Sequence, residues 1–124
     1  MWPDYFPPNC PPPEDSPQER AAYRLVLHDP PDKADFACPR VTQPNRRFGN
    51  KCIACGTSLI TRLPDAEKLL GTVYFKRKRF ELSLGRTRID CGLVLDTPSD
   101  SMPSHITYWI YPGSWVHNDF RVVS

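Results

Sequence analysis

Residues 22–28, Ala-Tyr-Arg-Leu-Val-Leu-His, form the stretch on which the interpretation of the fold depends. Their length and composition predict a β-strand, and the Asp29-Pro30-Pro31 sequence directly after them is typical of a turn. Successive residues of a strand point to opposite faces, so Arg24 is expected to share a face with Ala22 and Val26. Arginine is mostly exposed in proteins, and an arginine within an aliphatic strand therefore needs a partner.

The rest of the chain after this strand alternates short β-rich runs with turn residues. Residues 32–50 are polar and predict a long loop, a kind of segment that is often functional. Pro64 to Leu70 predicts a helix, because proline suits a first helical turn and Gly71 comes next as a stop. Together with the first strand, the pattern predicts an α+β fold with strands at 56–61, 73–75, 80–84, 88–95, 106–111 and 120–123.

The N-terminal segment differs in composition from the rest of the chain. Seven of the 15 prolines lie within the first 17 residues, where they disfavour helices and central strands. We therefore expect a Pro-rich arm over residues 1–20, mobile or draped on the surface, and one domain over residues 21–124. Three aromatic residues, Trp2, Tyr5 and Phe6, are candidates for pinning the arm to that domain.

Charge and hydropathy exclude several classes of protein. The net charge of +2 is too small to demand a nucleic-acid partner, and the mean hydropathy is −0.50. No window approaches the roughly 18 apolar residues of a membrane span, so no membrane partner is expected. The first residues lack the pattern of a secretory signal peptide, which favours a cytoplasmic location.

The five cysteines are an odd number, and with no signal peptide they predict free thiols in a reducing compartment. Cys52 and Cys55 form a CxxC pair, which resembles half of a zinc knuckle. A closed zinc site needs four ligands, and the second pair is missing. Cys38, together with His28 or Cys91, could supply the two missing ligands of such a zinc site, but only through long loops. We predict no metal, although a structural zinc at this turn stays an alternative to cysteines that merely fill space.

The densest charge cluster is Lys76-Arg77-Lys78-Arg79. One interpretation is a solvated hairpin edge protected by charge. The other is a contact surface for the backbone of a nucleic acid, although Phe75 and Phe80 flank the run instead of interleaving with it.

A dispersed set of polar residues favours a dinucleotide site. On the late strand, alternation places His105, Thr107 and Trp109 on one face. Arg24 would clamp a pyrophosphate, hydroxyls of residues 57–58 would bond to ribose, Gly56 would admit a flat amide, and an aromatic ring would stack on nicotinamide. The alternative is an exposed arginine and ordinary strand hydroxyls.

The order of these segments resembles a known family. Tyr23-Arg24-Leu25-Val26, Gly56-Thr57-Ser58-Leu59, the helix at 64–70 and His105-Ile106-Thr107-Tyr108 are similar to the skeleton of small ADP-ribosyltransferase-like toxins, of the effector type delivered by type VI secretion. The resemblance spans roughly residues 22–112 and rests on about a dozen positions.

The resemblance implies a split, strongly curved β-sandwich that holds NAD, as a substrate, in the cleft between its halves. It also implies cleavage of the nicotinamide–ribose bond, modification of an intracellular target, and an immunity or antitoxin partner. Matched residue by residue, it gives catalytic roles to Arg24, Ser58 and His105, and cofactor-binding roles to Tyr23, Arg24, Gly56, Thr57, Ser58, Thr107 and Tyr108.

The sequence departs from the family at one catalytic position. The family carries a glutamate on a later strand, which stabilises the oxocarbenium-like transition state. Here that strand offers His105 and Thr107 but no acid, and Glu81 and Asp90 are nominated from neighbouring strands. The alternative function is therefore a non-catalytic binding module of the same fold, which contacts a protein or a nucleic acid through Lys76–Arg79 and carries a structural zinc at the CxxC turn.

Overall fold

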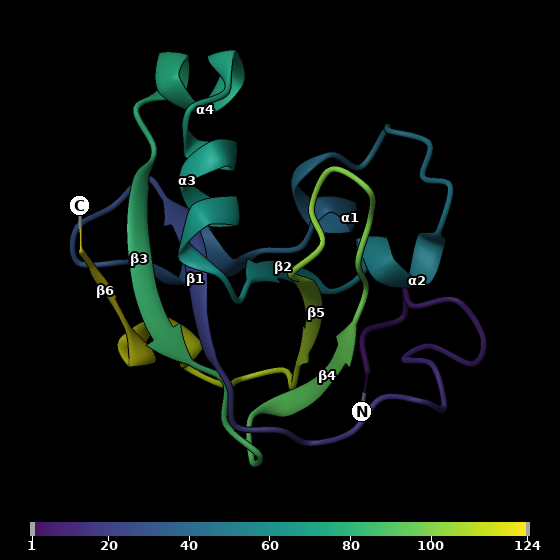
Figure 1. Ribbon diagram of the computed structural model, residues 1–124. Coiled ribbons are helices and arrows are strands. Elements are labelled where there is room, and N and C mark those ends of the chain that lie inside the picture. The colour runs from purple at the N-terminus through teal and green to yellow at the C-terminus, as the bar shows by residue number, and fades with distance from the viewer. Residues whose placement is uncertain (1, 124) are drawn as a thin grey trace.

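The computed structural model describes residues 2–123 and is a mixed α+β fold with a six-stranded antiparallel sheet (Figure 1). The order of the strands across the sheet is β4-β5-β2-β1-β3-β6. The strands are β1 (Ala21–Val26), β2 (Thr57–Ile60), β3 (Glu81–Arg86), β4 (Gly92–Asp96), β5 (His105–Ile110) and β6 (Phe120–Val122). The helical segments are η1 (Lys33–Phe36), α1 (Pro39–Thr42), α2 (Lys51–Ala54), α3 (Leu63–Leu70), α4 (Val73–Lys78) and η2 (Val116–Asp119).

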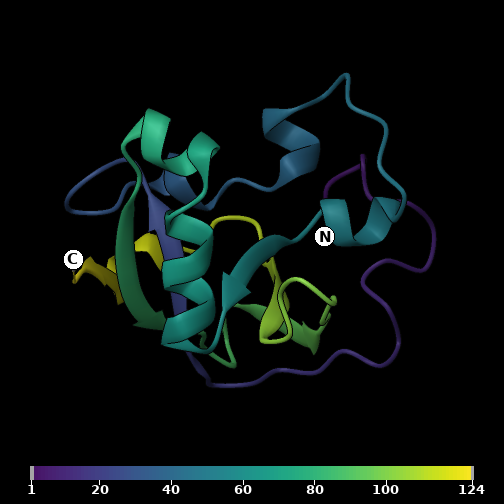
Figure 2. The same ribbon diagram turned by 45° about the horizontal axis from the view of Figure 1, so that its top comes forward.

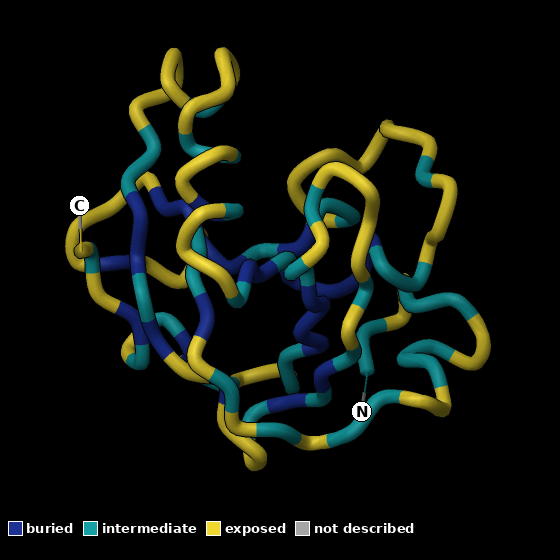
Figure 3. The backbone as a smooth tube through the Cα atoms, in the orientation of Figure 1, coloured by how far each residue is buried: buried dark blue, intermediate teal, exposed yellow. Residues whose placement is uncertain are grey.

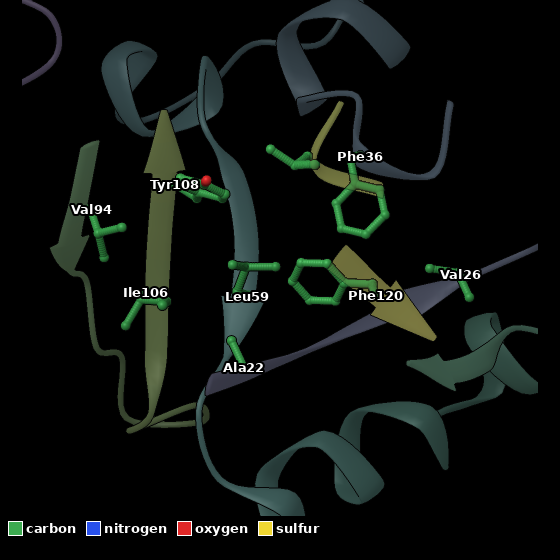
Figure 4. Packing of buried hydrophobic residues seen from close by; sticks show 9 residues of the cluster. Ala22, Val26, Phe36, Leu59, Val94, Ile106, Tyr108 and Phe120 are labelled. Atoms are coloured by element: carbon green, nitrogen blue, oxygen red, sulfur yellow. The ribbon is translucent and has the colours of Figure 1, made fainter. Parts of the chain in front are cut away.

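The sheet opens between its two central strands. Every residue of β1 has a partner on β3, whereas β1 and β2 share the single register pair Tyr23↔Ile60. On its other side β2 pairs with β5 from Thr57 to Ile60. Figure 4 shows β1 running at a steep angle to β2. The sheet is thus bent into two halves, β4-β5-β2 and β1-β3-β6, which meet where Tyr23 of β1 pairs with Ile60, the last residue of β2.

Apolar side chains fill both faces of the bent sheet. The larger cluster consists of Ala22, Val26, Phe36, Leu59, Val94, Ile106, Tyr108, Val116 and Phe120, and Figures 3 and 4 show this buried centre. The second cluster uses the alternate strand positions and consists of Leu25, Ile60, Ala66 and Leu82, with α3 covering it (Figure 2). The period of two along the strands therefore sorts the side chains between two packed layers.

Helix α3 confirms the helix predicted at residues 64–70, whereas the strand predicted at 73–75 is wrong. Those residues belong to α4, which ends with Arg79 in the left-handed conformation at φ 61°. The Val-Tyr-Phe run has high β-propensity, but β3 already has β1 and β6 on its two edges. The run instead packs by its aromatic rings, with Phe75 and Phe80 edge to face at 4.8 Å. Lys76–Arg79 consequently lie on a helix and its cap, and the hairpin expected there is absent from the described chain.

Two other boundaries differ from the sequence-based expectation. The predicted 32–50 loop contains η1 and α1, and η1 begins with a capping box between Asp32 and Asp35. The strand predicted at 88–95 begins later, at Gly92, because residues 88–91 form a turn closed by the Cys91 amide donating to the Arg88 carbonyl at 3.2 Å.

The Pro-rich arm lies along the edge of the domain (Figures 1 and 2). Ser16 forms an antiparallel bridge with Val94 of β4, through amide–carbonyl distances of 3.1 and 2.8 Å. Near the start of the arm, the Trp2 ring lies 5.2 Å from the rings of both Phe6 and Tyr111. Backbone pairing and aromatic packing therefore tie the arm at two places.

A disulfide between Cys10 and Cys52 ties the arm at a third place. The prediction of free thiols is wrong for this pair, while Cys38, Cys55 and Cys91 are free. The prediction failed because it rested on the odd number of cysteines and the missing signal-peptide pattern, and neither of these says which thiols the fold brings together. In the fold, the arm brings the Cα atom of Cys10 to 5.5 Å from that of Cys52, across a sequence separation of 42 residues.

Candidate functional site

A cleft of about 550 Å³ lies where the sheet opens, and we call it the Arg24 cleft. Its walls come from β1, β2 and the start of β5, from the η1–α1 segment, and from α3 and α4. Four of the residues proposed from sequence lie together in its lining: Tyr23, Arg24, Ser58 and His105. The volume falls within the range of about 300–1,000 Å³ that is common for ligand pockets.

Arg24 crosses the gap between the two halves of the sheet. Its Nε donates to the Asp35 carbonyl at 2.9 Å, and its Nη1 donates to the Ser58 carbonyl at 3.0 Å. The guanidinium carbon also lies 5.9 Å from the centre of the Phe36 ring. Because β1 and β2 pair only at Tyr23 and Ile60, the Arg24 side chain reaches a β2 carbonyl that the β1 backbone does not.

The Arg24 guanidinium is a half-buried cation, and no carboxylate in residues 2–123 forms an ion pair with it. Burial lowers the pKa of Arg24 to about 10, against a smaller raising effect of the nearby Asp35 charge. The side chain is therefore still charged at neutral pH. A half-buried charge held only by carbonyl groups is partly desolvated, and a guanidinium has five N–H donors, so this one can bind an anion.

Asp35 is the one acidic residue in the described lining of the cleft, and its carboxylate is already bonded. It accepts from the Leu27 amide at 2.9 Å, from the Asp32 amide at 2.8 Å, and contacts His28 Nδ1 at 3.0 Å. These bonds fix the turn between β1 and η1. Asp35 is therefore a structural carboxylate, and it supplies negative charge to the cleft only through space.

His105 begins β5 and lines the Arg24 cleft. Its Nδ1 lies 3.1 Å from the Thr97 carbonyl and 2.7 Å from the Thr97 hydroxyl. Burial lowers the pKa of His105. The hydrogen bond to the Thr97 carbonyl raises it by a smaller amount, and the positive charge of Arg24 lowers it again. The imidazole is thus neutral at pH 7. A carbonyl only accepts, so Nδ1 carries the proton and Nε2 keeps a lone pair.

The outer wall of the cleft is aromatic, and the sequence analysis did not place these residues in the site. Tyr74, Phe75 and Phe80 line it, with Tyr74 and Phe75 edge to face at 5.0 Å and Tyr74 58% exposed. The signal was present as three aromatic residues within seven positions. It was missed because a strand would have turned neighbouring rings to opposite faces, whereas α4 and its cap gather them.

The other four residues proposed from sequence lie outside the lining of the cleft. Gly56 packs against β5, since a Cβ atom there would lie 2.2 Å from Thr107 Cγ2. Thr57 donates its hydroxyl to the Phe36 carbonyl at 2.6 Å, and Thr107 lies 2.8 Å from the Thr97 hydroxyl. Tyr108 is fully buried, and its hydroxyl accepts from the Arg88 amide at 3.2 Å. The structure thus places Gly56, Thr57, Thr107 and Tyr108 in the packed core.

The two nominated acids and Trp109 also lie elsewhere. Glu81 begins β3 opposite Val26, and Asp90 lies in the exposed turn before β4. The indole of Trp109 donates to the Cys52 carbonyl at 2.9 Å. Neither acid lines the Arg24 cleft, so the departure from the family's glutamate extends from the sequence to the described part of the structure.

Residues 2–123 contain no group of three or more His, Cys, Asp or Glu side chains placed to hold a metal ion. Cys52 is consumed by its disulfide with Cys10, so the CxxC turn cannot offer two thiolates, and the alternative of a structural zinc there is wrong for this state of the chain. In the same described range, every helix is too short or too polar to span a bilayer.

Comparisons with known proteins provide no relative. No family model matches the chain, and neither a curated protein nor a solved structure matches it.

Proposed function

We propose that the chain is an ADP-ribosyltransferase-like toxin that binds NAD in the Arg24 cleft and breaks the bond between nicotinamide and ribose. One observation carries the proposal: a half-buried, charged arginine without an ion-pair partner in the described chain lies at the opening of a bent antiparallel sheet, beside Ser58 and His105. The bend between β1 and β2 agrees with the split, curved sandwich that the sequence resemblance implies. The NAD ligand and the toxin activity are our inference from the sequence resemblance, and this geometry supports the position of the cleft.

The side chains of the cleft that bear polar or aromatic groups have the following chemical roles in this proposal. The free N–H groups of Arg24 bind the pyrophosphate, and the Ser58 hydroxyl bonds to a ribose hydroxyl. The ring of Tyr74 or Phe75 stacks on a base. As the C–N bond breaks, its electron pair goes to nicotinamide. An acceptor oxygen then attacks the ribosyl carbon, and its proton goes to Nε2 of His105.

Because the carboxylate of Asp35 is already hydrogen-bonded, we expect the cleavage of NAD to be slow. No carboxylate of the described cleft has an oxygen free to touch the developing ribosyl cation. Electrostatic stabilisation of that charge is usually a large part of catalysis. We therefore expect measurable NAD binding with slow release of nicotinamide, and the two must be measured separately.

The proposed toxin would act on an intracellular target and have an immunity or antitoxin partner. The disulfide between Cys10 and Cys52 suits delivery by a secretion system, because disulfides are typical of proteins that meet an oxidising compartment.

The test is the affinity for NAD, measured by calorimetry on the wild type and on Arg24→Lys. Lysine keeps the charge but loses the planar fork, so we expect a loss of roughly tenfold or more, the value of one charge-assisted hydrogen bond. Arg77→Lys is the matched control, because Arg77 is exposed on α4 and lies outside the described lining of the cleft. Nicotinamide release, with and without cell extract, then measures cleavage. Equal affinities in the wild type and Arg24→Lys would exclude the nucleotide cleft.

A second candidate function is favoured by the absence of a free carboxylate in the described cleft. In this function the fold is a non-catalytic binding module, and the exposed Lys76–Arg79 contact a protein or nucleic-acid partner. None of these four cations forms an ion pair within residues 2–123. This function would replace the first if the wild-type chain binds a partner but not NAD, and if the variant Lys76→Ala/Arg77→Ala no longer binds that partner.

A further inference from the structure

A second basic cluster, invisible as a run in the sequence, converges on one hollow beside α1 and α2. Four cations line this cavity of about 570 Å³: Arg40, Arg46, Arg47 and Lys51. The remaining lining is Tyr5, Pro7, Pro44, Phe48 and Cys55, and it contains no aspartate or glutamate. We call this hollow the basic pocket. It is separate from the Arg24 cleft, and α1 lies between the two, with Thr42 lining the cleft and Arg40 lining the pocket.

The charge of the basic pocket is not compensated by the rest of the described chain. The four ion pairs within residues 2–123 are Arg20–Asp96, His28–Asp35, Arg86–Glu19 and Arg88–Asp119, all outside the pocket. Two other groups of its lining are neutral: burial raises the pKa of Tyr5 to about 12 and also raises the pKa of the Cys55 thiol. Four like charges without a counter-charge repel one another, and a bound anion would relieve this repulsion.

Two of the cations are held in place by aromatic rings. The guanidinium carbon of Arg40 lies 5.7 Å from the centre of the Tyr5 ring, and that of Arg46 lies 5.1 Å from the centre of the Phe48 ring. Arg46 also donates from Nη1 to Gln43 Oε1 at 3.2 Å. An arginine stacked on a ring keeps its planar fork for phosphate oxygens, and the same arrangement offers flat surfaces to a base.

The arm makes one wall of the basic pocket. Tyr5 and Pro7 come from the arm, and the disulfide between Cys10 and Cys52 joins the arm to α2, next to Lys51. Figures 1 and 2 both show the start of the chain beside α2, on the side away from β3. The pocket is therefore a concave site with a covalently fixed wall.

We propose that the basic pocket binds a short segment of single-stranded nucleic acid through its phosphates. The cluster combines uncompensated arginine and lysine with aromatic rings in a groove, which is the combination that single-strand binding uses. This inference is independent of NAD binding, because the pocket shares no lining residue with the Arg24 cleft. It also assigns the nucleic-acid contact to a different place from Lys76–Arg79.

The test is the affinity of the whole, oxidised chain for a fluorescent oligothymidylate of about twelve nucleotides, measured over a range of salt concentrations. Each phosphate contact contributes a slope of about −0.7 for a single strand, so four contacts predict about −2.8 in a plot of log affinity against log salt. Arg46→Ala/Arg47→Ala should weaken binding by more than roughly tenfold and reduce the slope by about 1.4. Both residues are exposed, so the fold should persist.

Two further variants test the proposal. One separates the contribution of ring stacking from that of charge, and the other separates the position of the cations from the net charge of the chain. Phe48→Leu should weaken binding several-fold and leave the salt slope unchanged, because stacking releases no counterions. Lys76→Ala/Arg77→Ala removes the same charge from α4 and should change the affinity by less than about twofold.

Four results would overturn the proposal. An equal loss in Lys76→Ala/Arg77→Ala would assign binding to the α4 run or to net charge. Equal displacement of the probe by polyglutamate would show a general polyanion surface, and displacement by inorganic phosphate at the same concentration of phosphate would show a site for a small anion. Tighter binding of a DNA duplex of the same length would exclude a single-strand site.

Discussion

The Arg24 cleft and the basic pocket lie on the two sides of α1, yet different parts of the molecule hold them. Strands β1, β2 and β5 carry Arg24, Ser58 and His105, so ladder hydrogen bonds fix the cleft. The basic pocket is built from the arm, the segment between α1 and α2, and α2, and a disulfide fixes it. A site on a sheet derives its rigidity from many weak bonds, whereas a site on loops depends on a few strong constraints. The two sites should therefore respond differently to the same kind of change.

Removing the disulfide should have the largest effect and should separate the two sites. In the chain-entropy account, a cross-link across 42 residues stabilises the fold by about 4 kcal/mol. We expect Cys10→Ser/Cys52→Ser to lose roughly 3–4 kcal/mol in urea unfolding, and residues 1–17 to become sensitive to protease. Oligothymidylate binding should weaken, while NAD binding under folding conditions should persist.

Cys91→Ser is the control for this experiment, because Cys91 is a free thiol that takes no part in the disulfide. An arm that resists protease as well as the core does, without the disulfide, would show that the Ser16–Val94 bridge and the Trp2 contacts are sufficient.

A matched pair of glycine substitutions compares the packing of the two regions. A Cβ atom at Gly92 in β4 would lie 2.2 Å from the Trp109 carbonyl oxygen, which belongs to the neighbouring strand and cannot move without breaking the ladder. A Cβ atom at Gly49, in the segment beside the basic pocket, would meet nothing within 4 Å. Gly92→Ala should cost about 2–3 kcal/mol and Gly49→Ala less than about 0.5 kcal/mol.

Urea unfolding of both variants checks this prediction. Equal losses would mean that the Gly49 segment is as tightly constrained as the sheet, and the contrast between the two regions would fail.

The indole of Trp109 links the two regions. Its Nε1 donates to the Cys52 carbonyl at 2.9 Å, and thereby joins β5 to α2. Trp109→Phe keeps most of the apolar ring but leaves that carbonyl without its donor, so we expect a loss of about 1–2 kcal/mol. Trp115→Phe is the control, because Trp115 is 66% exposed. If both variants unfold at the same urea concentration as the wild type, the link contributes nothing.

The sequence predicted the sheet region better than the loop region. Residues 22–28 and 106–111 have the strand composition that the structure confirms, and Arg24 was identified as an arginine in need of a partner. Four cations at positions 40, 46, 47 and 51 form no run in the chain. The segment between α1 and α2 brings them to one cavity, and the arm, which the disulfide joins to α2, adds the wall with Tyr5 and Pro7. No spacing rule encodes such an arrangement. The charged run at 76–79 was conspicuous in the sequence, but on α4 its side chains spread around a helix.

The smallest predicted effect is a pH dependence that belongs to the cleft alone. Burial lowers the pKa of His105 in the folded chain below its ordinary value of 6.5, whereas the described lining of the basic pocket contains no histidine. As the pH falls, His105 therefore binds a proton at a higher pH in the unfolded chain than in the folded chain. The contribution of His105 to the free energy of unfolding should be fully present above about pH 7 and decrease below about pH 6.5. His105→Asn can keep a donor near the Thr97 carbonyl but has no group that titrates in this range, so its unfolding free energy should decline less between pH 7.5 and 5. The salt-dependent binding of oligothymidylate should be unchanged by this variant at both pH values. A wild type and His105→Asn with parallel pH profiles would show that His105 is solvated in the folded chain, and the lone pair assigned to its Nε2 in the cleft would lose its basis.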